Sequence, residues 1–163
     1  MKVIQDIDKS ISVMQNASRW MKYEGIPISK WWDLKNLNKK FLVQYAKTDE
    51  FYCVLVDSNP AAAAILQMSQ SAQDWKNVDK NTPKPALYIH WLCVSKDFRG
   101  KQMPKVMIDF AGKLAKENNV RLLRADTNSE VVKLRKIYEN LGFKLVAEQQ
   151  EDYRKTAFYE KKV

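Results

Sequence analysis

Strand-like and helix-like segments alternate through the second half of this 163-residue chain, and this alternation is the strongest constraint on its fold. Apolar runs typical of strands occupy residues 86–94, 120–126, 143–149 and 156–163, and helical patterns occupy residues 104–119 and 129–142. Strands that alternate with helices at this spacing form β–α–β units with right-handed crossovers. We therefore expect an α/β fold with a mixed, twisted central sheet and helices on both faces.

The first half of the chain predicts two helices followed by a strand. Apolar residues recur at helical spacing over residues 6–24, and Gly25 is typical of a helix end. A second, shorter helix is expected over residues 34–45. Residues 51–57 are expected to form a buried strand that ends at a turn over residues 58–60.

The next two segments are harder to assign. The alanine-rich residues 61–70 favour a helix by propensity, but they follow a turn and a strand. We expect only their later half, around residues 65–68, to form the second strand of a hairpin. Residues 71–85 are polar and contain prolines, so we expect a surface loop that could close over a site.

Length and composition limit the class of protein. The chain has the length of one domain, and we expect a single domain over residues 1–163. No apolar run approaches the roughly 20 residues that span a bilayer, and the N-terminus carries no readable secretory signal, so we expect a cytoplasmic protein. Cys53 and Cys93 lie in apolar runs without a partner motif, which indicates reduced, buried residues and neither a disulfide nor a metal site.

The charge favours an anionic partner. Twenty-eight basic and 19 acidic residues give a formal net charge of +9, which suits a polyphosphate cofactor, an acidic substrate or nucleic acid. The basic clusters are short, and no aromatic residues are interleaved with them in the manner of a single-strand binding platform. Nucleic acid is therefore the least favoured of the three.

The stretch VSKDFRGKQMPK, residues 94–105, is the best candidate for an anion site. An expected strand ends at Val94 and an expected helix begins near Pro104, so the N–H groups of the loop and the positive end of the helix dipole point to one place. Arg99 and Lys101 add positive charge. The sequence of this loop alone is consistent both with an anion site and with an ordinary basic turn between a strand and a helix.

Residues 94–143 resemble the core of the GNAT superfamily of N-acetyltransferases. The family signature is a strand, an Arg/Gln-x-x-Gly-x-Gly/Ala loop, a helix, another strand and a closing helix. The segments of this chain that resemble these parts are, in order, ALYIHWLCV, RGKQMP, the helix at Pro104, VRLLRADTNSE and IYENLGF. SRWMKYEGIPISKWW resembles the upstream part of one bacterial branch. The resemblance implies direct transfer of an acetyl group from acetyl-CoA to a primary amine of a small molecule or peptide, within a ternary complex.

The loop departs from the family pattern at both small-residue positions. Gln102 and Pro104 replace the residues that would permit φ > 0 or close ligand approach, and Pro104 has no N–H to donate. A lost charge-assisted hydrogen bond would weaken cofactor binding by about ten- to a hundredfold. Val131 replaces an Asn common before the closing helix. These departures keep open an alternative, a binding or regulatory protein with weakened or lost acetyl-CoA binding.

The resemblance also assigns catalytic roles. It makes Tyr138 the acid that protonates the departing thiolate, and the alternative is a core tyrosine. It makes the N–H groups of Leu92–Val94 the donors that hold the pantetheine arm, with Cys93 a packing residue rather than a nucleophile. His90 is expected on the same strand face as Leu92 and Val94, where it is a candidate base, although a buried, hydrogen-bonded histidine is favoured.

The remaining assignments concern the two ligands. The residues placed at the cofactor are Leu92, Cys93, Val94, Arg99, Gly100, Lys101, Gln102, Met103 and Lys105. Tryptophans in the acceptor region are Trp20, Trp31, Trp32 and Trp75, with Tyr23 or Glu24 nearby, although core packing explains some of them equally well. Asp126 would orient the substrate or cap the following helix. The last strand, residues 156–163, could extend a sheet across a homodimer.

Overall fold

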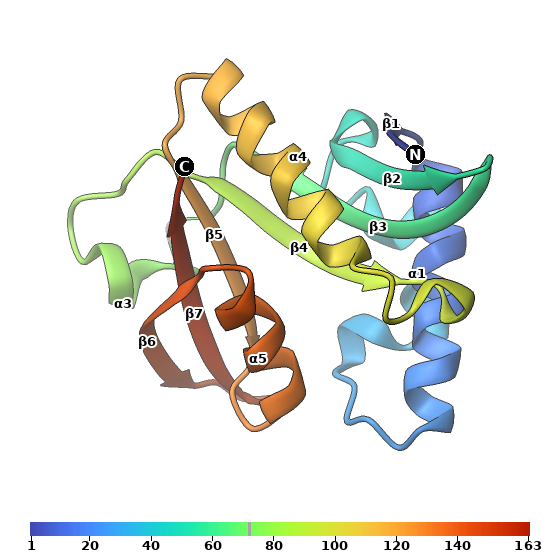
Figure 1. Ribbon diagram of the computed structural model, residues 1–163. Coiled ribbons are helices and arrows are strands. Elements are labelled where there is room, and N and C mark those ends of the chain that lie inside the picture. The colour runs from blue at the N-terminus through green and yellow to red at the C-terminus, as the bar shows by residue number, and fades with distance from the viewer. Residues whose placement is uncertain (72) are drawn as a thin grey trace. The chain divides into compact units, whose positions relative to one another are not determined.

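The computed structural model describes residues 1–71 and 73–163 and contains a seven-stranded sheet in the order β1-β2-β3-β4-β5-β7-β6 (Figure 1). Its contacts divide the chain into two compact units. The first unit contains residues 1–66 and 91–107, and the second contains residues 67–90 and 108–163. Strand β4 (Leu87–Val94) and helix α4 (Met103–Glu117) each contribute to both units.

The first unit is built on three antiparallel strands and one long helix. Strands β1 (Lys2–Gln5), β2 (Phe51–Val56) and β3 (Asn59–Gln67) pair side by side, and α1 (Ile7–Tyr23) packs against β2. Asp6 caps α1, because its carboxylate accepts the Lys9 N–H at 2.8 Å. The expected first helix is confirmed, whereas β1 had not been predicted from the sequence.

The hairpin between β2 and β3 differs from the expectation. Asp57 and Ser58 both have positive φ, 49° and 68°, as a tight two-residue hairpin turn requires. Strand β3 therefore begins at Asn59 and includes the four alanines at 61–64, all fully buried. The predicted hairpin is confirmed, but its second strand begins at Asn59 rather than near residue 65, because burial between neighbours overrides the helix propensity of alanine.

The predicted helix over residues 34–45 is also wrong. The chain instead forms two 3₁₀ turns, Lys30–Trp32 and Leu34–Asn36, and the single helical turn α2 (Lys39–Leu42). Asn38 starts this last turn, since its side chain accepts the Phe41 N–H at 3.0 Å. A capping residue inside the periodic segment thus divides it.

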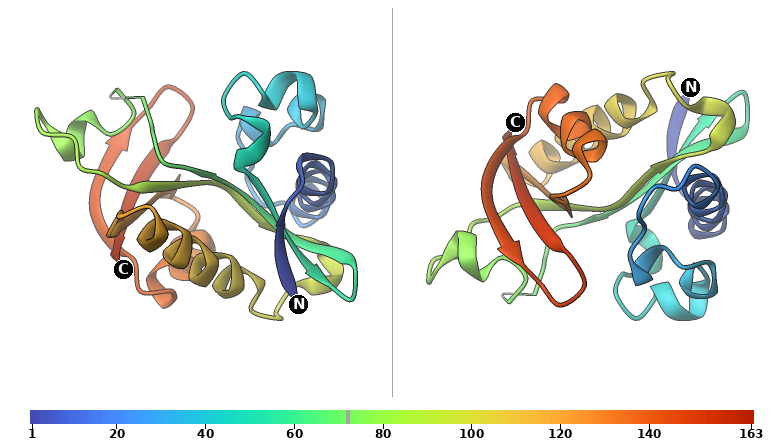
Figure 2. Two further views of the ribbon diagram at one scale, coloured as in Figure 1. Left: turned by 90° about the horizontal axis from the view of Figure 1, so that it is seen from above. Right: turned by 90° about the horizontal axis from the view of Figure 1, so that it is seen from below.

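The second unit contains the mixed part of the sheet. The first half of β4 pairs in parallel with β5 (Leu122–Asn128), and β7 (Lys155–Lys162) lies antiparallel between β5 and β6 (Lys144–Gln150). Helix α5 (Val132–Asn140) contacts β5 and β6, as the views in Figure 2 also show. The expected fold class, a mixed sheet with helices, is confirmed.

A buried arginine anchors the segment that precedes β4. Arg124 of β5 is fully buried and donates two hydrogen bonds to the Asp79 carboxylate, at 2.8 and 2.6 Å. It also donates to Glu160 of β7, and its guanidinium lies 4.6 Å from the centre of the Trp75 ring. Asp79 ends the short helix α3 (Lys76–Asp79). This segment is therefore attached to the sheet.

These contacts correct the interpretation of residues 71–85 as a surface loop at Trp75 and the helix α3, whereas residues 80–85 are exposed as expected. Trp75 is only 2% exposed and packs edge-on against Tyr88 and Phe158, so it is a core residue of the second unit. Its predicted place among the acceptor residues has no support in this geometry. Ala72, in the same predicted loop, lies outside the described residues.

The strand order also corrects the predicted route to a dimer. Strand β7 is paired on both sides, by β5 and β6, so residues 156–163 have no open edge to extend. The edge strands of the sheet are β1 and β6. In the described part of the chain, none of the helices combines the length and the apolar character needed to cross a bilayer.

Candidate active site

The loop between β4 and α4 is attached to the rest of the first unit at its start. The Ser95 N–H donates to the Ala61 carbonyl at 2.8 Å, and the Lys96 N–H donates to the Asn16 side chain at 2.8 Å. The Trp20 indole N–H donates to the Val94 carbonyl at 2.9 Å. Helix α1 and strand β3 thus position the loop.

Free backbone donors remain at the start of α4. Within residues 1–71 and 73–163, the N–H groups of Gly100, Gln102 and Met103 donate no hydrogen bond. Pro104 is the second residue of α4, within the first turn, where a backbone N–H has no intrahelical acceptor. Its ring therefore costs the helix nothing, and three donors still meet the positive end of the helix dipole.

The loop also keeps the backbone conformation that its missing glycines would favour. Gly100 has φ 74° and Gln102 has φ 57°. Gln102 thus adopts a left-handed conformation at a cost of about 1–2 kcal/mol. An added Cβ at Gly100 would meet nothing within 4 Å, so that position requires its φ angle rather than extra space. We had expected Gln102 to restrict this conformation, and the structure shows that the residue adopts it.

Arg99 is directed toward a protein partner. Its guanidinium forms an ion pair with Glu24, with Nη2 donating to Oε2 at 3.0 Å and Nη1 donating to Oε1, and it lies 4.3 Å from the centre of the Trp20 ring. Glu24 is the C-cap residue of α1. An anion at the loop would compete with the Glu24 carboxylate for this charge. The Lys101 ammonium lies 5.1 Å from the centre of the Phe98 ring.

The end of β4 has few groups able to act as a nucleophile. Leu92 and Val94 are partly buried, and Cys93 is 7% exposed in the core of the first unit. Burial raises the pKa of the Cys93 thiol far above its usual value, so the thiolate is not populated at neutral pH. This agrees with the expected packing role of Cys93.

An aromatic cluster surrounds Trp31 in the first unit. The Trp31 ring lies 5.1 Å from Tyr45, 6.2 Å from Phe41 and 6.2 Å from Trp91, and the Trp91 indole N–H donates to the Trp31 carbonyl at 3.2 Å. Trp32 instead packs against the core. Phe41, Tyr45 and Trp91 were not among the acceptor residues expected from the sequence. The spacing of Phe41 and Tyr45 predicted one face of a helix instead.

His90 is a partly buried, hydrogen-bonded residue of the second unit. Its Nε2 lies 2.7 Å from the Gln70 side-chain oxygen, and its Nδ1 lies 3.9 Å from an Asp126 carboxylate oxygen. Trp91 has φ 49°, which interrupts the extended backbone directly after His90. The expectation that His90 shares a face with Leu92 and Val94 assumed strict alternation along an extended strand, and the positive φ at Trp91 removes that assumption.

Asp126 and Tyr138 are also in the second unit. Asp126 forms an ion pair with Arg154, and it does not cap α5, whose N-cap is Val131 without a side-chain hydrogen bond. Of the two roles considered for Asp126, the capping role is therefore wrong and the substrate role stays a prediction; the ion pair with Arg154 had not been predicted. Tyr138 is 8% exposed, with its ring centre 5.5 Å from that of Phe143 in an edge-on contact.

A comparison with family models decides the classification. The model of the acetyltransferase (GNAT) domain matches residues 20–157. This chain belongs to the GNAT family. The matched range contains the loop between β4 and α4, the aromatic cluster around Trp31, and also Tyr138. The predicted resemblance to the GNAT superfamily is confirmed.

Solved structures of GNAT proteins share the fold. An acetyltransferase from Listeria monocytogenes is 24% identical with a TM-score of 0.74, over 99% of this chain and 94% of that one. One from Streptococcus agalactiae is 15% identical with a TM-score of 0.77, over 99% and 95%. The PaiA N-acetyltransferase of Thermoplasma acidophilum, in complex with coenzyme A, is 17% identical with a TM-score of 0.69, over 99% and 98%. No curated protein sequence matches.

Proposed function

We propose that this GNAT protein transfers an acetyl group from acetyl-CoA to a primary amine of a small molecule or peptide. The observation that carries the proposal is the set of three unbonded N–H groups, from Gly100, Gln102 and Met103, at the start of α4. Unbonded N–H groups at a helix start suit an anion such as a pyrophosphate, which supports the proposal. A structurally similar chain, at 14% identity and a TM-score of 0.65, belongs to a structure of the NatC complex bound to Gag peptide and CoA.

The chemistry is a direct attack. The amine nitrogen bonds to the thioester carbonyl carbon, the C–S bond breaks, and the thiolate takes a proton from Tyr138. The amine proton passes to His90 or to water. The N–H groups of Leu92–Val94 hold the pantetheine arm, and Lys101 and Lys105 add charge near the phosphates. The cluster around Trp31 and the Asp126 carboxylate are the proposed acceptor groups.

Calorimetric titration of acetyl-CoA tests the cofactor site. We expect the wild-type protein to bind with micromolar affinity, and the double variant Gln102→Gly, Pro104→Gly to bind more tightly because it gains one donor. A screen of amines then follows, with Tyr138→Phe as the control that binds cofactor but turns over slowly. If only the glycine-restored variant binds, the proposal fails.

The second candidate is a binding or regulatory protein that retains the fold without efficient cofactor binding. It is favoured by Pro104, which lacks a donor, and by the Arg99–Glu24 ion pair. Thermal unfolding with acetyl-CoA discriminates the two, since a ligand at 100 times its Kd stabilises by about 2.7 kcal/mol. No shift at millimolar acetyl-CoA or CoA supports this second candidate. Steeply salt-dependent binding of oligonucleotides would instead indicate nucleic acid as the partner.

A further inference from the structure

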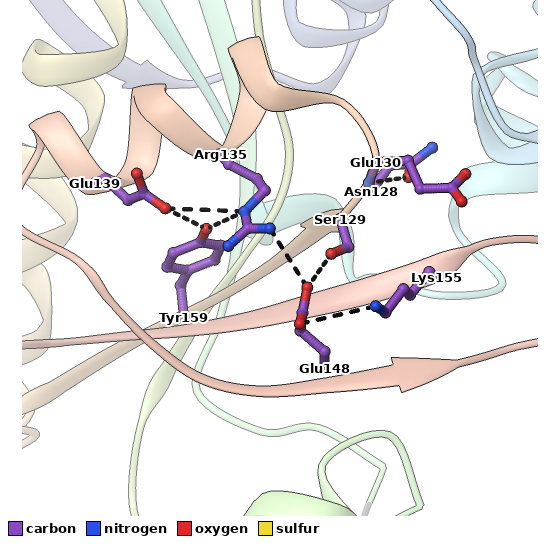
Figure 3. A network of polar contacts seen from close by, with 8 residues as sticks. All are labelled: Asn128, Ser129, Glu130, Arg135, Glu139, Glu148, Lys155 and Tyr159. Carbon is purple, nitrogen blue, oxygen red and sulfur yellow. Dashed lines mark hydrogen bonds and ion pairs between the residues drawn. The ribbon is translucent and has the colours of Figure 1, made fainter.

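The hydroxyl of Tyr159 is held between two charged residues of α5 (Figure 3). It donates to Glu139 Oε1 at 2.9 Å and accepts from Arg135 Nε at 3.1 Å. Tyr159 belongs to β7 and is fully buried. Burial raises the pKa of its phenol, so the hydroxyl stays protonated and able to donate. One strand residue therefore fixes two points of the helix.

These two points flank Tyr138. Arg135 and Glu139 lie one turn apart on α5, three positions before and one position after Tyr138. The rings of Tyr138 and Tyr159 are stacked, with centres 5.8 Å apart and an interplanar angle of 21°. The Tyr159 side chain thus has two roles. Its hydroxyl is hydrogen-bonded to the helix on both sides of Tyr138, and its ring forms the surface on which the Tyr138 ring lies.

Arg135 is held from a second direction. Glu148 of β6 accepts from Arg135 Nη1 at 3.4 Å and from the Ser129 hydroxyl, and it lies 3.9 Å from the Lys155 ammonium. The Ser129 hydrogen bond lowers the pKa of Glu148, which keeps it ionised as a partner for Arg135. The guanidinium consequently cannot rotate away from Tyr159 without losing its contact with the neighbouring strand.

We propose that Tyr159 is a positioning residue that fixes the ring of Tyr138 for proton donation to the departing thiolate. This inference rests on the proposed function, since it assigns a partner to the proposed acid. A phenylalanine at 159 would bury the same ring, so packing alone does not require the hydroxyl. A buried hydroxyl is costly unless it is hydrogen-bonded, and both of its partners lie on the helical turn that carries Tyr138.

Steady-state kinetics of Tyr159→Phe test the proposal. We expect kcat to fall roughly tenfold with an unchanged KM for acetyl-CoA, because a displaced catalytic group slows chemistry without weakening cofactor binding. Lys161→Met is the matched control. Lys161 lies on the same strand and donates to the Leu141 carbonyl at the end of α5, at 2.6 Å, and its ammonium lies 6.0 Å from the centre of the Phe143 ring. It should lower Tm and leave kcat unchanged.

A double-mutant cycle separates positioning from stability. If Tyr159 acts through Tyr138, the substitution Tyr159→Phe has no further effect on kcat in a Tyr138→Phe background. Full additivity of the two changes, or an unchanged kcat in Tyr159→Phe alone, overturns the proposal. The proposal is also overturned if Tyr159→Phe and Lys161→Met lose the same amount of Tm and show the same fall in kcat.

A spectroscopic readout makes the test independent of turnover. In protein with ¹³C-labelled tyrosine rings, the Tyr138 ring signals should broaden in Tyr159→Phe and stay sharp in Lys161→Met, where the lost charge beside Phe143 changes only their position. Signals that stay sharp in both variants refute the positioning role. If the protein acetylates no amine but shows the expected signal changes, the proposed function is refuted and the contact between the two tyrosine rings is retained. Failure of the proposed function and failure of the positioning role can therefore be distinguished.

Discussion

Replacing Gln102 with glycine should stabilise this protein, although glycine normally destabilises a folded chain. Gln102 has φ 57°, a conformation that costs an L-residue about 1–2 kcal/mol and glycine nothing. Glycine also increases the entropy of the unfolded chain, which costs about 0.4–1 kcal/mol. The net expectation for Gln102→Gly is a gain of about 0–1.5 kcal/mol in the free energy of unfolding.

The matched control is the neighbouring substitution Lys101→Gly. Lys101 is in the same turn but is not among the described residues with positive φ, so it gains nothing from glycine and should lose about 0.4–1 kcal/mol. For a chain of this length, the two variants should differ in Tm by about 2–8 °C, measured by calorimetry at one pH and scan rate. Gly100→Ala should be destabilised, because its φ of 74° would then be strained.

The result that would refute this reasoning is a loss of stability in Gln102→Gly as large as that in Lys101→Gly. It would mean that the left-handed conformation at 102 carries no strain. Titration of CoA provides an independent check, because the unbonded N–H groups at the loop do not depend on the side chain of residue 102. Affinity should stay within about threefold of the wild type in Gln102→Gly.

Three further predictions concern charge and reactivity. Glu24→Gln should tighten CoA binding at low salt, measured by calorimetry, because Arg99 loses its competing partner; unchanged affinity would mean that Arg99 does not reach the phosphates. Asp79→Asn should lower the free energy of unfolding by about 2–4 kcal/mol in urea titrations, since Arg124 is fully buried; a loss below 1 kcal/mol would contradict this. The Arg124 hydrogen bonds lower the pKa of Asp79 below its ordinary 3.8, so this contribution is present above that value and is lost as the pH falls through the lowered pKa of the folded state. Cys93 should resist alkylation at pH 8 in the native state, followed by mass spectrometry, and rapid native-state labelling would show that its thiol is accessible.

The sequence predicted the second half of the fold well, because hydrophobic periodicity there is strong and each element ends at a clear signal. The closing helix was the main exception, expected over residues 129–142 and observed as Val132–Asn140. Its first turn is lost because Ser129 has other partners. The Ser129 N–H donates to the Lys155 carbonyl at 2.8 Å, and its hydroxyl donates to Glu148. These contacts come from strands that follow later in the chain and leave no local signal.

The missed features share this dependence on distant residues. Trp75 is buried by Phe158 and Arg124, which lie far away in sequence, so its polar flanks suggested a loop. The four alanines at 61–64 are strand residues because neighbours cover them, and alanine carries no strand signal of its own. For the candidate site, the loop and Tyr138 were identified through motif spacing, whereas the Arg99–Glu24 and Asp126–Arg154 ion pairs required the structure.

The hydrogen bonds of Arg124 also determine how the segment before β4 should open. Helix α3 has only four residues, and its amide hydrogens would exchange with almost no protection if it behaved as an ordinary surface turn. Separating Asp79 from Arg124 would leave a buried guanidinium with only the partners on β4 and β7. Opening of this segment is therefore coupled to loosening of the sheet. The amides of α3 should therefore exchange more slowly than those of an ordinary surface turn, and Asp79→Asn should remove this protection.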